Sequence, residues 1–348
     1  MLPYWFLLSL PVGIVLANRR LSERSKMWVW SVVWLFFVLA IGLRYKVGGD
    51  WFAYLNHLDL RTTMPLSEVL LKSDPGYYLI NWVVAQLGGS IYWVNTVCGM
   101  ILMTGVIRFS RSQPLPWLAL VVAVPYLIIV VGMGYTRQSG ALGLLLIGLV
   151  SLGNGKMRWF LFWVMLGATF HKSAVLMLPV AALASTSNRF LSVLWIGLVT
   201  LVGGYLFLFD SAEVLWTNYV EADYQSQGGL IRVLMNSVPA VLFFLLRRRL
   251  RLSDAEDKLW FWMSILALVC IPLVVLSSTA TDRVALYLIP IQLFVFSRLP
   301  FVMEDGGRRA LLVLAVVGYY ILVQVVWLFF ASHSFAWLPY ENIVWVHE

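Results

Sequence analysis

Long apolar runs recur along the whole chain, and they constrain its fold more than any other feature. Four of them cover residues 27–43, 190–209, 259–278 and 310–331. A helix needs about 20 apolar residues to cross a hydrocarbon layer roughly 30 Å thick. With 61% hydrophobic and 12% charged residues, the chain does not have the composition of a soluble domain. The runs are continuous and do not alternate as barrel strands do, so they predict an all-α, polytopic helical membrane protein.

The order of the runs predicts about twelve crossings in a single transmembrane domain, residues 1–348. The apolar stretch 77–87 is half a crossing and is followed by Gly88 and Gly89, which indicates a short re-entrant or interfacial helix. Residues 2–17 carry their basic flank after the run, which favours a retained first helix over a cleaved signal. The predicted crossings are residues 3–18, 27–43, 91–107, 116–132, 135–152, two halves of 159–179, 190–209, 230–246, 259–278, 284–296 and 310–331.

Basic residues account for the net charge of +8, and their positions indicate topology. They gather in short loops, which are typical of the cytoplasmic side of a membrane protein. The loops are too short for a nucleic-acid recognition module, so we expect no nucleic-acid partner. On this basis two longer loops, about residues 44–76 and 210–229, are predicted to be external. The basic residues concerned are Arg19, Arg20, Arg24, Lys26, Arg247, Arg248, Arg249, Arg251, Arg298, Arg308 and Arg309.

A second set of ionisable residues stands at or inside the ends of the apolar segments, on the predicted external side. Such groups are expensive to keep at membrane depth, so by default they line a wet cavity that handles a substrate or ion. Arginines beside carboxylates indicate an anionic, phosphate-bearing cargo. These residues are Arg44, Asp50, Arg137, His171, Lys172, Asp282 and Arg283.

The densest constellation begins at Arg44, where the segment 27–43 leaves the membrane. Arg44 can bind a phosphate or a sugar hydroxyl, Asp50 can accept from sugar hydroxyls, and Trp51 and Tyr54 offer flat surfaces for sugars. An interfacial aromatic belt with a snorkelling arginine would produce a similar pattern. Both interpretations stay open on spacing alone.

Two further positions begin helices on the same side. Asp74 before Pro75 has the pattern of a helix N-cap followed by proline, a structural role that could explain both residues. Arg137 lies near the start of the segment 135–152, against the positive end of the helix dipole. An anion held between Arg137 and the free N–H groups of the helix would relieve this conflict.

His171, Lys172 and Ser173 interrupt an otherwise apolar run, and packing does not readily explain a His–Lys pair there. Histidine suits proton transfer near neutral pH, so this break is a candidate catalytic element. Asp282 and Arg283 form either a local ion pair or a phosphate-binding arginine oriented by its aspartate. Cys98 and Cys270 lie in apolar segments, and we expect neither a disulfide nor a metal site.

Together these motifs resemble the EpsG/Wzy-type family of bacterial polysaccharide polymerases, which lengthen O-antigen, capsule or exopolysaccharide chains. The resemblance rests on an ordered set of short motifs that spans nearly the whole chain. They are the R-x-x-x-x-G-D-x-x-x-Y block at 44–54, D-P-G-Y-Y-L-I-N at 74–81, Arg137-Gln138-Ser139, the block 170–173, Asp282-Arg283 before Tyr287, and the tail block 339–342 with Tyr340.

The resemblance implies a GT-C-like membrane glycosyltransferase in the bacterial cytoplasmic (inner) membrane. The growing glycan would leave undecaprenyl diphosphate and join the non-reducing end of a lipid-linked repeat unit at the periplasmic or outer face. The partners would be the lipid-linked donor and acceptor and membrane lipids, with room for a chain-length regulator protein. No cofactor or metal is implied, because the departing lipid diphosphate carries the energy of the reaction.

Such a transfer needs cations for the departing diphosphate and a base for the acceptor hydroxyl. His171 and Asp50 are the predicted catalytic residues. We favour His171 as base, since burial and Lys172 both favour a neutral imidazole, and Asp50 would then bind the acceptor sugar. The predicted substrate-binding residues are Arg44, Tyr54, Asp74, Arg137, Gln138, Lys172, Asp282, Arg283, Tyr287 and Tyr340.

Two other classes of protein compete with a polymerase. A flippase for lipid-linked sugars would also hold arginines in a cavity, but it needs access from both faces and usually shows internal repeats. A ligase uses the same donor, and a membrane acyltransferase could use a histidine base. Internal repeats are absent from the sequence and the unusual charges gather on one predicted face, which favours a polymerase over a transporter.

Overall fold

The computed structural model describes residues 1–17, 22–61, 63–184, 194, 197–198, 200–202 and 228–346. Most of the predicted crossing 190–209 and of the predicted loop 210–229 lies outside these residues, as do Arg19 and Arg20. The regular elements of the described residues are helices apart from a pair of two-residue strands, as the apolar runs predicted.

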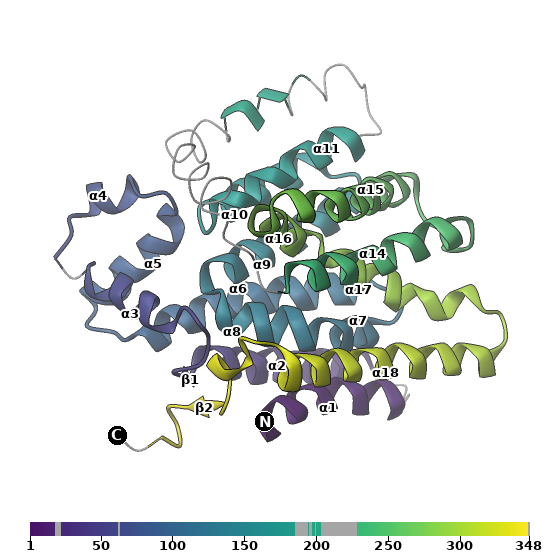
Figure 1. Cartoon of the computed structure of the whole chain (residues 1–348), viewed down its shortest axis with the longest axis horizontal. Coiled ribbons are helices and arrows are strands. Elements are labelled where there is room, and N and C mark those ends of the chain that lie inside the picture. The colour runs from purple at the N-terminus through teal and green to yellow at the C-terminus, as the bar shows by residue number, and fades with distance from the viewer. Residues whose placement is uncertain are drawn as a thin grey trace. The chain divides into compact units, whose positions relative to one another are not determined.

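The elements follow one another in chain order (Figure 1). They are α1 (Leu2–Ala17), α2 (Glu23–Gly42), β1 (Arg44–Tyr45), α3 (Trp51–Asp59), α4 (Leu66–Leu70), α5 (Pro75–Gln86), α6 (Ile91–Arg111), α7 (Pro116–Ala123), η1 (Val124–Val131), α8 (Gly132–Gly134), α9 (Thr136–Gly153), α10 (Met157–Ala168), η2 (Lys172–Met177), α11 (Leu178–Ala184), α14 (Gly229–Leu246), η5 (Arg247–Arg249), α15 (Asp254–Leu276), α16 (Ser278–Leu288), α17 (Pro290–Arg298), η6 (Leu299–Val302), α18 (Gly306–Phe330), η7 (Ser334–Ala336) and β2 (Glu341–Asn342).

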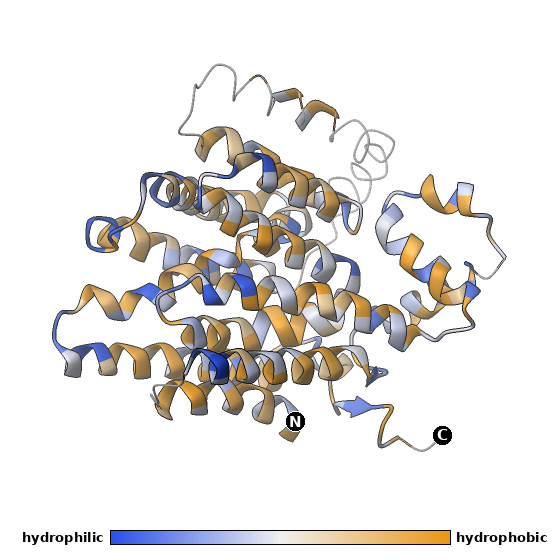
Figure 2. Cartoon of the chain, turned by 180° about the vertical axis from the view of Figure 1, so that it is seen from behind, coloured by the Kyte–Doolittle hydropathy of each residue, from blue (hydrophilic) through white to orange (hydrophobic). Residues whose placement is uncertain are grey.

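Six described helical segments are long and apolar enough to cross a membrane, or seven if the pair bent by 44° at residues 278–302 counts as one span. All of them coincide with predicted crossings. Three shorter apolar helices, Leu2–Ala17, Met157–Ala168 and Lys172–Ala184, fall on further predicted crossings. The described part of the chain therefore shows a multi-pass helical membrane protein, whereas the predicted total of about twelve is not shown. Figure 2 shows apolar residues dominating the long helices, with polar residues at their ends.

The chain divides into two compact units. The first comprises Met1–Leu144, Thr169–His171 and Val313–Glu348, and the second comprises Leu145–Ala168 and Lys172–Leu312. A short piece of chain, Thr169–His171, thus belongs to the first unit although both of its neighbours belong to the second. The prediction that the whole chain is a single transmembrane domain stays a prediction.

In the first unit the segment Pro116–Gly134 is the most deeply buried of the helices long enough to cross a membrane. Within its most apolar 18-residue stretch, 94% of the residues are buried inside the protein. Its middle is a π-helix that begins one residue before Pro125, whose ring nitrogen cannot donate a hydrogen bond. The Trp337 indole donates to the carbonyl of Ile129 in this segment, at 3.1 Å. The C-terminal tail is thereby tied to the centre of the unit.

Helices α6 and α9 approach closely at two glycines. A Cβ built on Gly105 would lie 2.0 Å from the carbonyl oxygen of Gly143, and one on Gly143 would lie 2.5 Å from the carbonyl oxygen of Ile101. Small residues let helix backbones meet in this way inside membranes, where apolar side chains provide little drive for association. Only glycine fits at this crossing without moving the backbones apart.

We expect Gly105→Ala to destabilise the protein by roughly 1–3 kcal/mol, because the added methyl group must push α6 away from α9. Thermal unfolding of the purified protein in detergent would measure the loss. Gly13→Ala is the matched control, since nothing lies within 4 Å of the position of its Cβ in α1. Equal stability of the two variants would show that the α6–α9 crossing tolerates separation.

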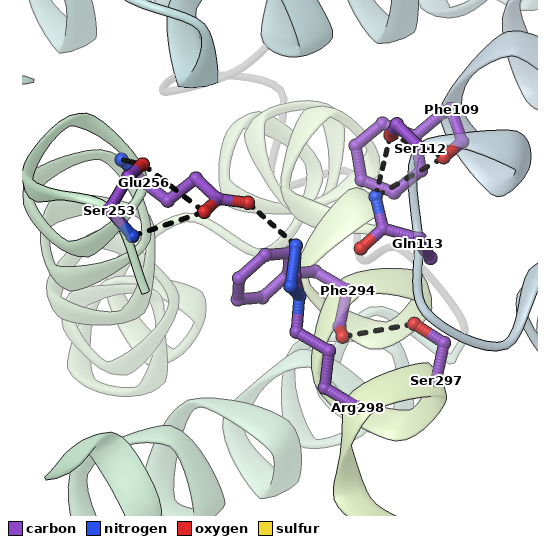
Figure 3. A network of polar contacts seen from close by, with 8 residues as sticks. All are labelled: Phe109, Ser112, Gln113, Ser253, Glu256, Phe294, Ser297 and Arg298. Carbon is purple, nitrogen blue, oxygen red and sulfur yellow. Dashed lines mark hydrogen bonds and ion pairs between the residues drawn. The ribbon is translucent and has the colours of Figure 1, made fainter. Parts of the chain in front are cut away.

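In the second unit α14, α15 and α16 pack together, and ion pairs close one end of the bundle. Figure 3 shows Glu256 between Ser253, with which it forms the capping box of α15, and Arg298, whose Nη2 lies 2.6 Å from the Glu256 carboxylate. Arg247 pairs with Asp257 in the same helix. The first pair joins the end of α17 to the start of α15, and the second joins the basic loop 247–251 to the same helix.

Candidate functional site

The first turn of α9 is the centre of a polar cluster in the first unit. Three consecutive residues there contact three different segments of the chain. Thr136 accepts a hydrogen bond from Arg44, Arg137 donates to Asp74, and Gln138 meets His171. The structure thus brings together predicted residues that stand far apart in the sequence.

Arg44 is completely enclosed, with 1% of its surface exposed. Its guanidinium donates to the carbonyls of Ile41 and Val47, to Asn95 Oδ1 at 3.1 Å and to Thr136 Oγ1 at 2.8 Å. Every guanidinium nitrogen therefore has a partner, and the residue joins the end of α2 to α6 and α9. Arg44 organises the site in this structure, and its direct contact with substrate stays a prediction.

Asp74 occupies the N-cap position of α5, and Pro75 begins the helix as the sequence predicted. Its side chain, however, makes no capping hydrogen bond. The carbonyl oxygen of Thr169 accepts from the N–H groups of Gly76 and Tyr77 instead, at 2.8 and 3.3 Å. Gly76 permits this approach, since a Cβ there would lie 2.3 Å from Thr169 Oγ1. The Asp74 carboxylate is thereby released from capping and turns to Arg137.

The ion pair between Arg137 and Asp74 offsets the unfavourable position of a cation at the positive end of the α9 helix dipole. Arg137 Nη1 lies 2.9 Å from Asp74 Oδ2, so the anion that the positive helix end requires is supplied from within the protein. The Asp74 side chain is 3% exposed, whereas that of Arg137 is 30% exposed. Arg137 Nε has no hydrogen-bond partner among the described residues. The Arg137 side chain is therefore held by Asp74, lies beside Tyr54 and keeps an exposed part that a ligand can reach.

Asp50 and Tyr54 complete this side of the cluster. Asp50 is exposed and directly precedes α3, and Tyr54 lies one turn into the same helix with its ring buried. Burial and the nearby Asp50 carboxylate raise the pKa of Tyr54 to about 12, against the opposing effect of Arg137. The Tyr54 hydroxyl therefore stays protonated, and it lies close to Arg137.

His171 lies at the predicted break, between the end of α10 at Ala168 and the start of η2 at Lys172. The residue is 9% exposed, and its Nε2 lies 3.4 Å from Gln138 Nε2. Gln138 Oε1 is buried and has no partner among the described residues. Gln138 follows Arg137 in the first turn of α9, so this turn contacts both the break at His171 and, through Arg137, Asp74.

Four predicted residues, Lys172, Asp282, Arg283 and Tyr287, belong to the second unit. Asp282 forms an ion pair with Arg232 of α14, and both side chains are 12% exposed. Nothing in the local sequence indicated this partner, which is 50 residues away. Neither of the two interpretations of Asp282 and Arg283 included it. Tyr287 is buried, and Arg283 and Lys172 are half-buried.

Tyr340 lies in the C-terminal tail beside β2, which pairs with β1 so that Arg44 faces Asn342. Its hydroxyl donates to the carbonyl of Ala40 at 2.8 Å and accepts from Asn342 Nδ2 at 3.2 Å. The tail thus supports the segment that carries Arg44. A contact of Tyr340 with substrate stays a prediction.

Three residues near the cluster were missed in the sequence: His57, Arg61 and Asn95. Asp50, Tyr54, His57 and Arg61 follow one another at helical spacing, and this periodicity could have placed them on one face. Asn95 is a polar residue in the first turn of an apolar helix, and its Nδ2 is buried without a partner among the described residues. Within the described ranges no three His, Cys, Asp or Glu side chains are placed to hold a metal ion.

Comparison with known proteins identifies the family of the chain. A sequence profile of the EpsG family matches residues 27–342. The chain belongs to the EpsG family. The match includes every predicted site residue, and it places this membrane protein in the context of polysaccharide biosynthesis. No curated protein and no solved structure matches the chain significantly.

We expect Arg137 and Asp74 to be energetically coupled. A double-mutant cycle with Asp74→Asn and Arg137→Gln should give a coupling energy of about 1–2 kcal/mol in thermal unfolding, since solvent reaches Arg137 and screens the pair. Glu304→Gln, at an exposed position outside the cluster, should show no coupling with Arg137→Gln. Additive effects of the two site substitutions would mean that the contact contributes nothing to stability.

Proposed function

We propose that this EpsG family member is a membrane glycosyltransferase that polymerises a polysaccharide. It transfers a growing glycan from undecaprenyl diphosphate to the non-reducing-end hydroxyl of a lipid-linked repeat unit. The observation that carries the proposal is the polar cluster at the start of α9. There a partly exposed arginine is paired with a buried aspartate, and the next residue of the helix contacts an imidazole, within an apolar helical protein.

In this proposal Arg137 binds the departing diphosphate. A guanidinium matches phosphate oxygens in its planar fork, and the positive end of the α9 helix dipole adds to the positive potential. Asp74 orients Arg137 through their 2.9 Å contact. Positive groups already in place where negative charge develops lower the barrier to the departure of the diphosphate.

The proposed site faces the periplasm or exterior. In the first unit the cluster lies at the C-terminal end of α2 and the N-terminal end of α6. The opposite ends of these helices carry Arg24 and Lys26 on α2, and Arg108 and Arg111 on α6. Basic residues favour the cytoplasmic side of a membrane, which supports the placement of the cluster at the other face.

A ligase that moves a finished glycan to another lipid, or a flippase that transports the lipid-linked unit, would use the same ligand. Deletion of the gene followed by gel analysis of the surface glycan distinguishes these classes. We expect single repeat units from the loss of a polymerase. Long unattached chains would indicate a ligase, and absence of the glycan at the surface would indicate a flippase.

Arg137→Lys should slow polymerisation strongly although it keeps the charge. A lysine ammonium cannot reproduce the planar fork, and loss of one charge-assisted contact of roughly 1.5–3 kcal/mol lowers the rate on the order of ten- to a hundredfold. Chain length and turnover with purified lipid-linked repeat units would show the loss. Arg111→Lys, on the exposed opposite end of α6, is the matched control. Normal chains from the Arg137→Lys variant would leave Arg137 with only a structural role.

Labelling of engineered cysteines tests the proposed orientation. Phe52→Cys in α3 should react with an impermeant maleimide added from outside, whereas Asp254→Cys at the start of α15 should react only after the membrane is permeabilised. Both positions are exposed, and the native cysteines Cys98 and Cys270 are buried. Labelling of Asp254→Cys from outside in intact cells would reverse the topology.

A further inference from the structure

His57 of α3 stands beside the polar cluster but was not among the predicted site residues. Its ring lies 5.4 Å from that of Tyr78, 6.2 Å from that of Tyr54 and 6.4 Å from that of Tyr77, measured between centroids. The residue is half-buried, whereas the three tyrosines are buried. The aromatic rings fix the imidazole in place and leave part of it accessible.

The imidazole of His57 makes no hydrogen bond with any residue that the structure describes. His171 differs, because it is 9% exposed and meets Gln138. A base must come within hydrogen-bonding distance of the proton that it removes. Of these two histidines, His57 is the more accessible and has both ring nitrogens available to a ligand.

Two arginines set the charge around His57. Arg137 is the partly exposed cation of the cluster, and Arg61 lies over the ring of Tyr78 at 4.3 Å. Burial, Arg137 and Arg61, in that order, lower the pKa of His57 to about 4. The imidazole is therefore neutral in the free protein, with an unprotonated nitrogen, and it lies close enough to Arg137 for that cation to lower its pKa. The ionisable groups of the surrounding elements are Asp50, Tyr54, Asp59 and Arg61 of the α3 segment, Asp74, Tyr77 and Tyr78 of the α5 segment, and Arg137 of α9.

We infer that His57 is the catalytic base that accepts the proton of the acceptor sugar's hydroxyl. The inference rests on the proposed polymerase function and replaces His171 in that role. The acceptor oxygen forms a bond to the anomeric carbon of the donor glycan as its proton moves to a nitrogen of His57. The bond between that carbon and the diphosphate oxygen breaks, and the electron pair leaves with undecaprenyl diphosphate. The imidazolium then returns its proton to the departing diphosphate, so protons and electrons balance.

The same geometry makes His57 responsive to the donor. A dianionic diphosphate bound at Arg137 offsets the positive potential that disfavours imidazolium, so His57 becomes more basic when donor is present. A base with a low pKa in the free protein is poorly matched to its task, and donor binding moves it toward neutrality. His171→Ala would then affect the packing of Gln138 and not the proton transfer itself.

Histidine NMR of the purified full-length protein tests the coupling. The chain has only four histidines, so the spectrum of the His57→Gln variant identifies the resonance. With saturating inorganic pyrophosphate, we expect the protonation midpoint of His57 to move upward by about one pH unit or more. The exposed His333 in the same sample should not move. Pyrophosphate that binds without moving the His57 midpoint would overturn the inference.

Turnover with lipid-linked repeat units tests the chemical role. His57→Ala should lower kcat about a hundredfold or more while changing KM little, and added imidazole should restore part of the rate. His57→Gln keeps most of the side-chain volume and should fail equally, whereas His333→Ala should behave as wild type. A wild type that polymerises alongside a fully active His57→Ala variant contradicts only the role of His57. A wild type that does not polymerise contradicts the proposed function, and the role of His57 with it.

Discussion

The ion pair between Arg137 and Asp74 is the contact on which the rest of the candidate site depends. A helix that begins inside an apolar protein with an arginine in its first turn needs a nearby anion. Asp74 can serve only because it is not required as a cap, since the Thr169 carbonyl binds the free N–H groups of α5. That carbonyl is available because the chain leaves helical geometry between Ala168 and Lys172. The same break places His171 at Gln138, so one electrostatic requirement is linked to the position of the imidazole.

Features that depend on local sequence could be predicted, and those that depend on distant contacts could not. The membrane-spanning helices, the helix start at Pro75 and the break at His171 follow from hydropathy and from backbone preferences within a few residues. The predicted role of Asp74 as a cap was wrong for its side chain, because a residue 95 positions later supplies the hydrogen-bond acceptor. His57 was not predicted as a site residue, although it stands two helical turns after Asp50. The reason is that a lone histidine in a short amphipathic helix has no distinctive sequence pattern.

Asp282 shows the same difference in the second unit. The local sequence offered Arg283 as its partner, but successive residues of a helix point in different directions, and Arg232 of the neighbouring helix α14 fills that role. One turn further along α14, Asn236 donates to the carbonyl of Ala285 and accepts from Gln292. A polar track thus runs between α14, α16 and α17 inside apolar helices. Buried polar groups of this kind must be paired with one another, which accounts for the selection of Arg232.

Arg44 and Arg137 differ in burial, and this difference separates an arginine that supports the fold from one that a ligand can reach. Arg44 follows the end of α2 and contacts the first turn of α9, Arg137 lies in that turn, and both were predicted to bind substrate. Arg44 is 1% exposed and all its nitrogens have protein partners, so a ligand could reach it only by displacing several hydrogen bonds. Arg137 is 30% exposed and is held in place by Asp74 and by its contact with Tyr54. A diphosphate gains most from a guanidinium that is already oriented and still partly exposed, and that guanidinium belongs to Arg137.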